Sequence, residues 1–380
     1  MLREIKKAIK EIFYTVKNGN IQEIKQLIDK YEKYFSPLAL FFGFIVDSLT
    51  LTRVDLWLDN LILLTYMFLI GGSILMLNAH ESGHFKNRTI RRGVLWLPFL
   101  MQFAFGGLFS GFVVLYSRSA SIMASWPFLS VLLLLLIGNE FFKGKYKRLF
   151  FQLNIFYVAI FSYLIFAVPV VLNQMGPFIF LLSGFISLLL IAGLIKLIAH
   201  ITPWKIYFNQ KTITLMIGGI FAGFNILYFL NIIPPIPLAL KDIVIAHSVE
   251  LQRGAGARVT FEDPPWYKFY REYDNVYHRI GSEPIFVYSA VFAPTDLTTT
   301  IVHEWAYWDE SSGKWKTTDQ IMYPIFGGRN EGYRGFSTKA HVAPGKWRVS
   351  VKTKGGQLLG RTKFTIIEAD SLPELKAEIR

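Results

Sequence analysis

The 380-residue chain contains no cysteine, and only 18% of its residues are charged. Without thiols it can form neither a disulfide nor a thiolate metal site. Soluble globular domains average about 25% charged residues, so a single soluble domain is not the expected class. With 52% apolar and 16% aromatic residues, the composition is typical of a membrane protein with an attached soluble part.

The net charge of +13 is unevenly distributed along the chain. Residues 1–242 contain 22 Lys and Arg against 11 Asp and Glu, whereas residues 243–380 contain 18 against 16. Most of the excess lies between long apolar runs rather than along a soluble face. This pattern indicates the lipid bilayer as a partner and argues against a nucleic-acid partner.

Apolar runs between residues 37 and 231 predict an all-α membrane domain of seven transmembrane helices. They are residues 37–52, 58–77, 93–116, 124–142, 150–172, 177–199 and 213–231. Lys and Arg alternate between dense and sparse in the connecting segments, with 18 on one side of the bundle and 3 on the other. The positive-inside rule then places the N-terminus in the cytosol and the C-terminal region on the other side of the membrane.

Residues 1–36 precede these runs and predict two basic amphipathic cytosolic helices. They lie either on the inner leaflet or as a small hairpin packed on the loops. The basic start is not followed by an apolar run until about residue 38, so no cleavable signal peptide is expected.

Small residues recur inside the predicted spans, as in Gly107-x-x-x-Gly111 and Gly219-x-x-x-Gly223. Such pairs let helices approach closely in lipid. We expect them to pack the bundle internally, with dimerisation as the alternative.

Four ionisable residues cluster near the first predicted span: Asp47, Arg53, Asp55 and Asp59. Charge is costly in lipid, so each is a functional candidate. The alternative is an interfacial polar network that ends this span. A transporter would need further carboxylates at the bilayer midplane, and the sequence places none there.

The segment His80-Glu81-Ser82-Gly83-His84 matches the pattern H-E-x-x-H. Two histidines one helical turn apart can bind zinc, while the glutamate activates a water molecule. Glu140 and His200 end other spans on the same predicted side. The alternative function is therefore a metal-dependent membrane hydrolase, with Glu81 catalytic and His80, His84, Glu140 and His200 as zinc ligands. The competing interpretation is an interfacial cap, for which no cofactor is expected.

The C-terminal half changes character from long apolar runs to short alternating segments. Residues 232–242 predict a Pro-rich linker, residues 243–368 an all-β immunoglobulin-like sandwich and residues 369–380 a tail. Period-two alternation predicts strands at Thr299–Trp308 and Trp347–Lys354. This alternation points Trp305 and Trp347 into the core.

Three aromatic residues border predicted turns of this region: Trp308, Trp315 and Tyr333. An aromatic ring offers an apolar face with a polar rim, which suits stacking on a sugar or a peptide. These residues are therefore the predicted binding site for an envelope glycan or protein. The alternative is that they cover sheet edges or rest on the membrane surface. The oligomeric state stays open.

Several motifs in this half resemble those of a known family: Val302-His303-Glu304-Trp305, the segment 333–339, and Gly345-Lys346-Trp347-Arg348-Val349. On the basis of these motifs, residues 284–367 resemble the bacterial domain of unknown function 2914. The apolar half is similar to multi-span proteins that end in this domain. The resemblance implies a membrane protein with a terminal β-domain, and it implies no activity.

Overall fold

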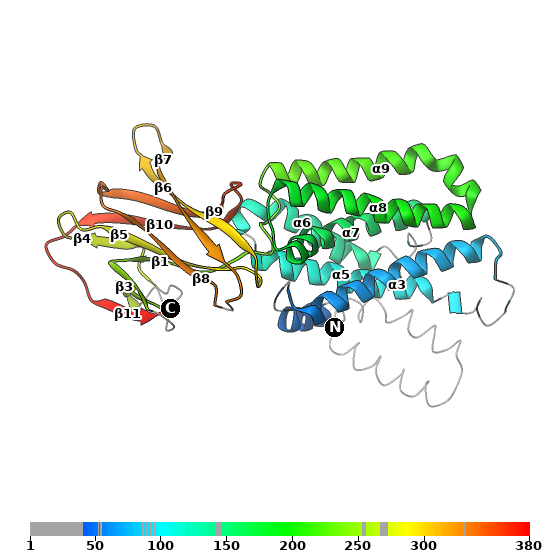
Figure 1. The fold of residues 1–380 in the computed structure, drawn as a ribbon, viewed down its shortest axis with the longest axis horizontal. Coiled ribbons are helices and arrows are strands. Elements are labelled where there is room, and N and C mark those ends of the chain that lie inside the picture. Colours follow the sequence, from blue (N-terminus) through cyan, green and yellow to red (C-terminus); the bar gives the residue numbers. More distant parts are fainter. Residues whose placement is uncertain are drawn as a thin grey trace, which may run out of the picture.

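The computed structural model describes residues 41–380. Within that range it leaves out residues 52, 54, 86, 88–89, 91–92, 95, 120, 142–145, 147, 253–255, 267–272 and 330. The basic helices predicted for residues 1–36 lie outside the described residues. A helical region comes first in the chain and a β-rich region follows it, as the sequence predicts (Figure 1).

Five helices of the described chain are long and apolar enough to cross a membrane. They are α3 (Trp57–Glu81), α5 (Leu97–Ser119), α7 (Leu149–Leu172), α8 (Pro177–Ile201) and α9 (Pro203–Phe229). Two shorter apolar helices, Phe41–Thr50 and α6 (Ile122–Gly138), stand where the first and fourth spans are predicted. A 3-10 turn, η1 (Asn139–Phe141), follows α6. Five crossings are therefore supported by length and composition, and the count of seven stays a prediction.

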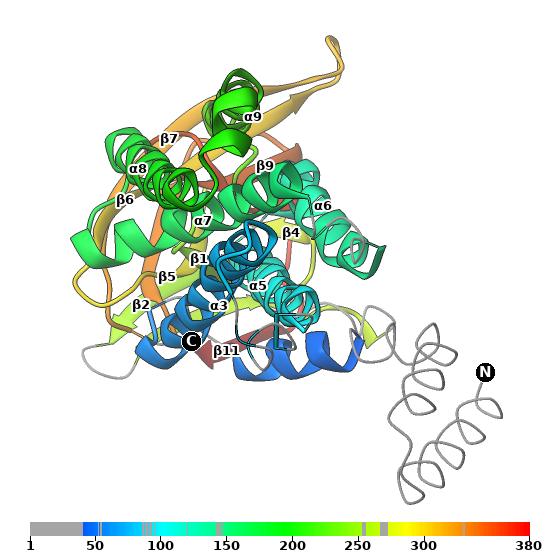
Figure 2. The same cartoon turned by 90° about the vertical axis from the view of Figure 1, so that its right-hand side faces the viewer.

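Helix α7 occupies the middle of the bundle, with the other helices around it (Figure 2). Phe161 of α7 is fully buried, and its ring packs against those of Phe180, Phe221 and Phe224. Aromatic side chains from three helices therefore fill one side of the bundle core.

Close packing of α3 on α5 depends on glycine. A Cβ atom added to Gly107 would lie 2.6 Å from the ring of Tyr66, so only glycine fits here without a shift of that ring. At Gly219 and Gly223 of α9 an added Cβ would meet nothing within 4 Å. The first small-residue motif therefore packs the bundle as expected, whereas the second faces open space.

The β-rich region contains eleven strands among the described residues. They are β1 (Ala239–Ala246), β2 (Ser248–Gln252), β3 (Gly256–Glu262), β4 (Val276–Arg279), β5 (Ile285–Phe292), β6 (Thr298–Asp309), β7 (Lys314–Phe326), β8 (Tyr333–Lys339), β9 (Gly345–Thr353), β10 (Leu358–Glu368) and β11 (Leu375–Ile379). They form three sheets, with the orders β1-β5-β8, β4-β10-β9-β6-β7 and β11-β3-β2. Neighbouring strands are antiparallel except β4 and β10.

Alternation along β1 explains why the sheets stack in layers. Ile245 points into a core shared with Trp305 and Trp347 of the five-stranded sheet. Its neighbours Val244 and Ala246 point the other way, into a core shared with the sheet of β2, β3 and β11. The sheet β1-β5-β8 is therefore the middle layer. Trp305 and Trp347 lie in the core, with exposed fractions of 0% and 3%, as predicted.

Two boundaries differ from the sequence-based prediction. β1 begins at Ala239, inside the predicted linker. β11 lies inside the predicted tail, because it pairs with the edge of β3, and Arg380 next to it forms an ion pair with Asp242. Both differences arise from long-range pairing, which local patterning does not reveal.

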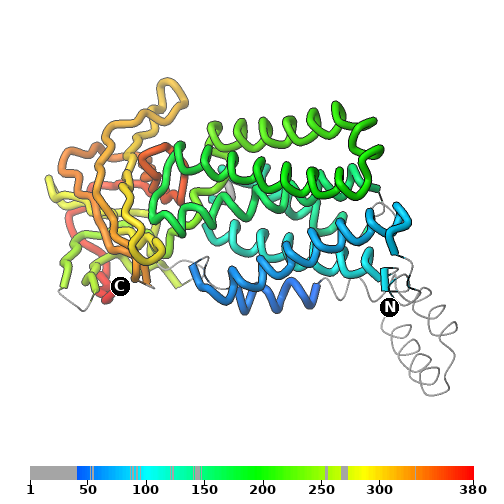
Figure 3. The backbone as a smooth tube through the Cα atoms, turned by 45° about the vertical axis from the view of Figure 1, so that its right-hand side comes forward, coloured from blue at the N-terminus to red at the C-terminus, as the bar shows by residue number. Residues whose placement is uncertain are grey.

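The β-rich region sits against one end of the bundle (Figures 1 and 3). The Gln357 side chain in the β9–β10 turn donates to the backbone oxygen of Ile233 at 3.3 Å. The guanidinium of Arg53 lies 5.0 Å above the ring of Phe292 in β5. Met175, in the α7–α8 turn, packs against the core of the β-region. These contacts fix which end of the bundle faces the β-region.

Candidate functional site

The five-stranded sheet has one face turned away from the middle layer, which we call the outer face. Its residues alternate with the buried ones of β6, β9 and β10. Trp308 and Trp315 form a directly opposed cross-strand pair on this face, and their ring centroids are 5.2 Å apart. The structure therefore brings two of the three predicted binding aromatics together.

Cations surround this tryptophan pair. The guanidinium of Arg348 lies 4.8 Å from the ring centroid of Trp315, and the ammonium of Lys363 lies 5.9 Å from the same ring. Both distances are within the range of cation–π attraction. Arg348 is opposed on β6 only by the small Ala306, which leaves room for the Trp315 ring to extend diagonally across β6 toward it.

The charges of the outer face are not balanced locally. Arg348 and Lys363 are directly opposed on β9 and β10, and Arg361 lies one step along the face from Lys363. A like-charged pair in this arrangement costs about 0.2–1 kcal/mol. Burial, followed by the charge of Arg361, lowers the pKa of Arg348, and the charge of Glu304 opposes this shift in part.

The carboxylates nearest to these cations already have partners. Glu304 accepts from Lys352 at 2.7 Å, and Asp309 pairs with Lys316 at the tip of the β6–β7 hairpin. Among the residues that the structure describes, no carboxylate forms an ion pair with four of the cations of the outer face: Lys346, Arg348, Arg361 and Lys363. The face therefore combines an aromatic platform with unneutralised positive charge.

Tyr333, the third predicted binding residue, lies elsewhere. It starts β8 in the middle sheet, where its ring is 6.0 Å from that of Phe326 and 5.8 Å from the guanidinium of Arg329. The sequence also does not single out Arg348 or Lys363, because their approach to Trp315 depends on the pairing of four strands.

Behind the outer face, β6 carries the fully buried His303. Its Nε2 atom is 2.9 Å from the Ser289 hydroxyl, and its Nδ1 atom is 2.8 Å from the Ser337 hydroxyl. The Trp305 indole N–H donates to Ser337 at 3.0 Å. Burial lowers the pKa of His303 to about 3, so this imidazole is neutral at neutral pH. The cluster joins the five-stranded sheet to the middle sheet.

This cluster predicts an acid-sensitive β-region. The pKa of His303 is about 3 in the folded chain and near 6.5 when unfolded, so the unfolded chain binds more protons between these values. Stability is therefore lost as the pH falls from about 6.5, at roughly 1 kcal/mol per pH unit. Denaturant unfolding at pH 7, 6, 5 and 4 measures the slope. The variant His303→Asn has no side chain at this position that binds a proton in this range. An equal dependence of unfolding free energy on pH in both proteins would contradict the role of His303.

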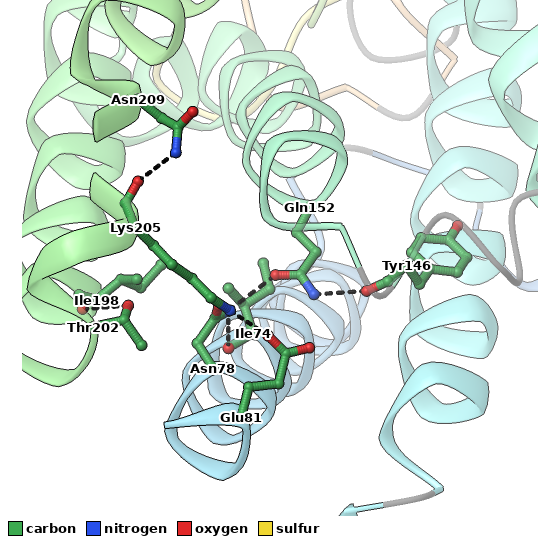
Figure 4. A network of polar contacts seen from close by, with 9 residues as sticks. All are labelled: Ile74, Asn78, Glu81, Tyr146, Gln152, Ile198, Thr202, Lys205 and Asn209. Carbon is green, nitrogen blue, oxygen red and sulfur yellow. Dashed lines mark hydrogen bonds and ion pairs between the residues drawn. The ribbon is translucent and has the colours of Figure 1, made fainter. Parts of the chain in front are cut away.

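The end of the bundle remote from the β-region holds a buried network of uncharged polar groups (Figure 4). The amide of Asn78 in α3 donates to the Gln152 side chain in α7 at 3.1 Å, and Gln152 donates to the backbone oxygen of Tyr146 at 2.6 Å. The Tyr146 hydroxyl donates to Asn139, which donates to the backbone of Gln102 in α5 at 2.9 Å. These bonds satisfy the groups internally and tie α3, α5, α7 and η1 together.

The H-E-x-x-H segment ends α3 beside this network. Glu81 pairs with Lys205 of α9, as Figure 4 shows, and the ring of His80 stacks near that of Phe85 at 6.5 Å. His84 and His200 are exposed, and the Glu140 side chain lies outside what is described. Within the described part, no group of three His, Asp or Glu residues could hold a metal ion. Zinc binding at His80 and His84 stays a prediction, testable by metal analysis of a His80→Ala/His84→Ala variant.

The four ionisable residues near the first predicted span lie at the end of the bundle that faces the β-region. Arg53 pairs with Asp55, with the Nε–Oδ1 and Nη2–Oδ2 distances at 2.9 and 2.5 Å. Asp59 is buried in the first turn of α3, and Asp47 is half-buried in the helix Phe41–Thr50. The contact of Arg53 with Phe292 makes these groups part of the boundary between the two regions.

Comparisons with known proteins relate one part of the chain to a family. No curated protein matches the chain. One solved structure, Pseudomonas fluorescens alkylpurine DNA glycosylase AlkC bound to DNA containing an abasic site analog, aligns at 10% identity. The alignment covers 83% of this chain and 99% of that chain with a TM-score of 0.21, too low to indicate a shared fold. Residues 298–366, which run from β6 to near the end of β10, match the family described as Protein of unknown function (DUF2914).

Proposed function

We propose that this chain is an integral protein of a bacterial inner membrane and acts by binding rather than by catalysis. Its seven helices hold an immunoglobulin-like β-domain on the extracytoplasmic side, where the outer face binds an envelope glycan or protein. The lipid bilayer is the partner of the helices. The observation that carries the proposal is the Trp308–Trp315 pair, flanked by Arg348 and Lys363.

Three features support binding as the role of this face. Trp308 of β6 and Trp315 of β7 lie on the face of the sheet opposite the core, so they are not needed to fill it. Four cations of this face form no ion pair with a carboxylate of the described residues, and Glu304 beside them is paired with Lys352. His303, which lies behind the face, is buried in the core and neutral, as suits a structural group.

Co-sedimentation of the purified full chain with insoluble envelope material tests this proposal. The wild-type protein is expected to sediment, and Trp315→Ala is expected to lose most of this binding because it removes both the ring and its cation contacts. Leu251→Ala is the matched control, since Leu251 is an exposed apolar side chain on β2, which is not part of the five-stranded sheet. Equal sedimentation of all three proteins would contradict the proposal.

A further inference from the structure

Resting on the proposed function, we propose that the outer face takes an acidic glycan, that is, a sugar polymer that carries carboxylate, phosphate or sulfate groups. Trp315 stacks on a sugar ring, and Arg348, Arg361 and Lys363 bind its anionic substituents. Lys346 extends the same positive strip along β9.

The cations of the outer face lie close to one another. Arg348 and Lys363 face each other directly across β9 and β10, and Arg361 faces Ser350 one step along. Arg361 Nε donates to the Ser350 hydroxyl at 3.0 Å, so a neutral group rather than an acid holds it. The carboxylate of Glu304 lies near Arg348 but is already paired with Lys352, so three cations remain in excess and an anionic ligand relieves their repulsion.

The guanidinium of Arg348 is not fully hydrogen-bonded within the fold. Its Nε atom is buried and has no hydrogen-bond partner within the described residues. A guanidinium that holds the fold together is normally tied by several such bonds. Arg348 instead lies against the Trp315 ring, which leaves the ends of its fork free for a ligand.

The outer face presents positive charge and an aromatic surface at the same place. A sugar ring presents an apolar face, and Trp offers the matching flat surface with cations at its edge. An acidic peptide uses the ring as well only where one of its own side chains stacks on it. A sugar polymer that bears anions uses both at one place.

The distance from the bundle distinguishes a glycan from the headgroups of the protein's own membrane. The β9–β10 turn contacts the bundle through Gln357, and β9 ends at Thr353. Arg348 lies five residues before Thr353, about 17 Å along the strand. Salt screens charges beyond about 8 Å at physiological ionic strength. Figure 1 shows the tip of the β6–β7 hairpin projecting from the upper edge of the β-region.

A binding experiment with matched polymers tests this inference. The full chain is placed in phosphatidylcholine nanodiscs, and tryptophan fluorescence is titrated with dextran sulfate, neutral dextran and polyphosphate. Dextran sulfate is expected to bind at least about tenfold more tightly than either of the others, because only it offers sugar rings and anions together. Its affinity is expected to fall as salt is added.

Variants separate this site from general attraction to a basic protein. Trp315→Ala is expected to weaken dextran sulfate binding about tenfold and polyphosphate binding little. Arg348→Gln/Lys363→Gln should weaken both. The control Arg258→Gln/Lys354→Gln removes the same charge from exposed positions off the outer face and should leave both nearly unchanged.

Each contrary outcome has a distinct meaning. Equal binding of dextran and dextran sulfate, or equal losses in the two double variants, would overturn the acidic-glycan assignment. Tighter binding of the protein to duplex DNA than to dextran sulfate would also overturn this assignment. Tighter binding to nanodiscs that contain phosphatidylglycerol would do the same. If envelope material still sediments with the wild type but not with Trp315→Ala, the proposed function stands and only the ligand class is wrong.

Discussion

Replacing Trp305 by alanine is expected to lower the free energy of unfolding of the β-region by about 3–5 kcal/mol. Its indole is fully buried, and it packs edge-on against Trp347 at 6.4 Å and Phe364 at 6.2 Å. Removing it leaves a cavity between the five-stranded and middle sheets. It also removes the indole N–H that donates to Ser337 beside His303. The measurement is denaturant unfolding of the full chain, followed by near-ultraviolet circular dichroism.

Trp308→Ala is the matched control for this experiment. It makes the same chemical change three residues further along β6, but on the outer face. The free energy of unfolding should change by no more than about 1 kcal/mol, while binding to envelope material is weakened. A loss in Trp308→Ala as large as that in Trp305→Ala would show that the alternation of β6 is wrong.

Gly107→Leu is expected to destabilise the bundle by about 1–3 kcal/mol or more, because it forces α3 away from α5. Even a single Cβ atom at this position would lie 2.6 Å and 2.8 Å from two carbons of the Tyr66 ring. A leucine side chain adds three more carbons to that contact. The thermal unfolding midpoint of the detergent-solubilised chain measures the effect, and the yield of monodisperse protein should fall with it.

Gly219→Leu tests whether the effect of Gly107→Leu comes from packing rather than from placing leucine in an apolar helix. A Cβ at Gly219 meets nothing within 4 Å. This variant should therefore unfold at or near the wild-type temperature. If Gly219→Leu is as damaging as Gly107→Leu, the open face of α9 is an interface in the assembled protein, and the packing argument for α5 loses its control.

The sequence predicts those features that depend on local periodicity. Apolar runs predict the long helices, and alternation places Trp305 and Trp347 in the core, because burial selects residues at the period of each element. The described helix in the first predicted span covers only residues 41–50, and α6, which stands at the fourth, is only 17 residues long. Crossing of a membrane by these two helices depends on the bilayer as well as on the chain.

Features that depend on pairing between distant segments could not be predicted. The contact of Trp315 with Lys363 joins residues on β7 and β10, which are separated by two intervening strands. The His303 cluster takes its serines from β5 and β8, where neither has a local signal. The pairing of Glu81 with Lys205 likewise joins the ends of α3 and α9. In each case the chemistry depends on register, which sequence patterns leave open.

The central claim is that the two ends of the bundle lie on opposite sides of a membrane, with the β-region outside. Because the chain has no cysteine, single Ser82→Cys and Ser312→Cys variants each carry one thiol. Both serines are exposed turn residues, one after α3 and one in the β6–β7 hairpin. A membrane-impermeant maleimide applied to intact cells with a permeabilised outer layer should label Ser312→Cys at once and Ser82→Cys only after lysis. Labelling of both before lysis, or of Ser82→Cys alone, would contradict the account.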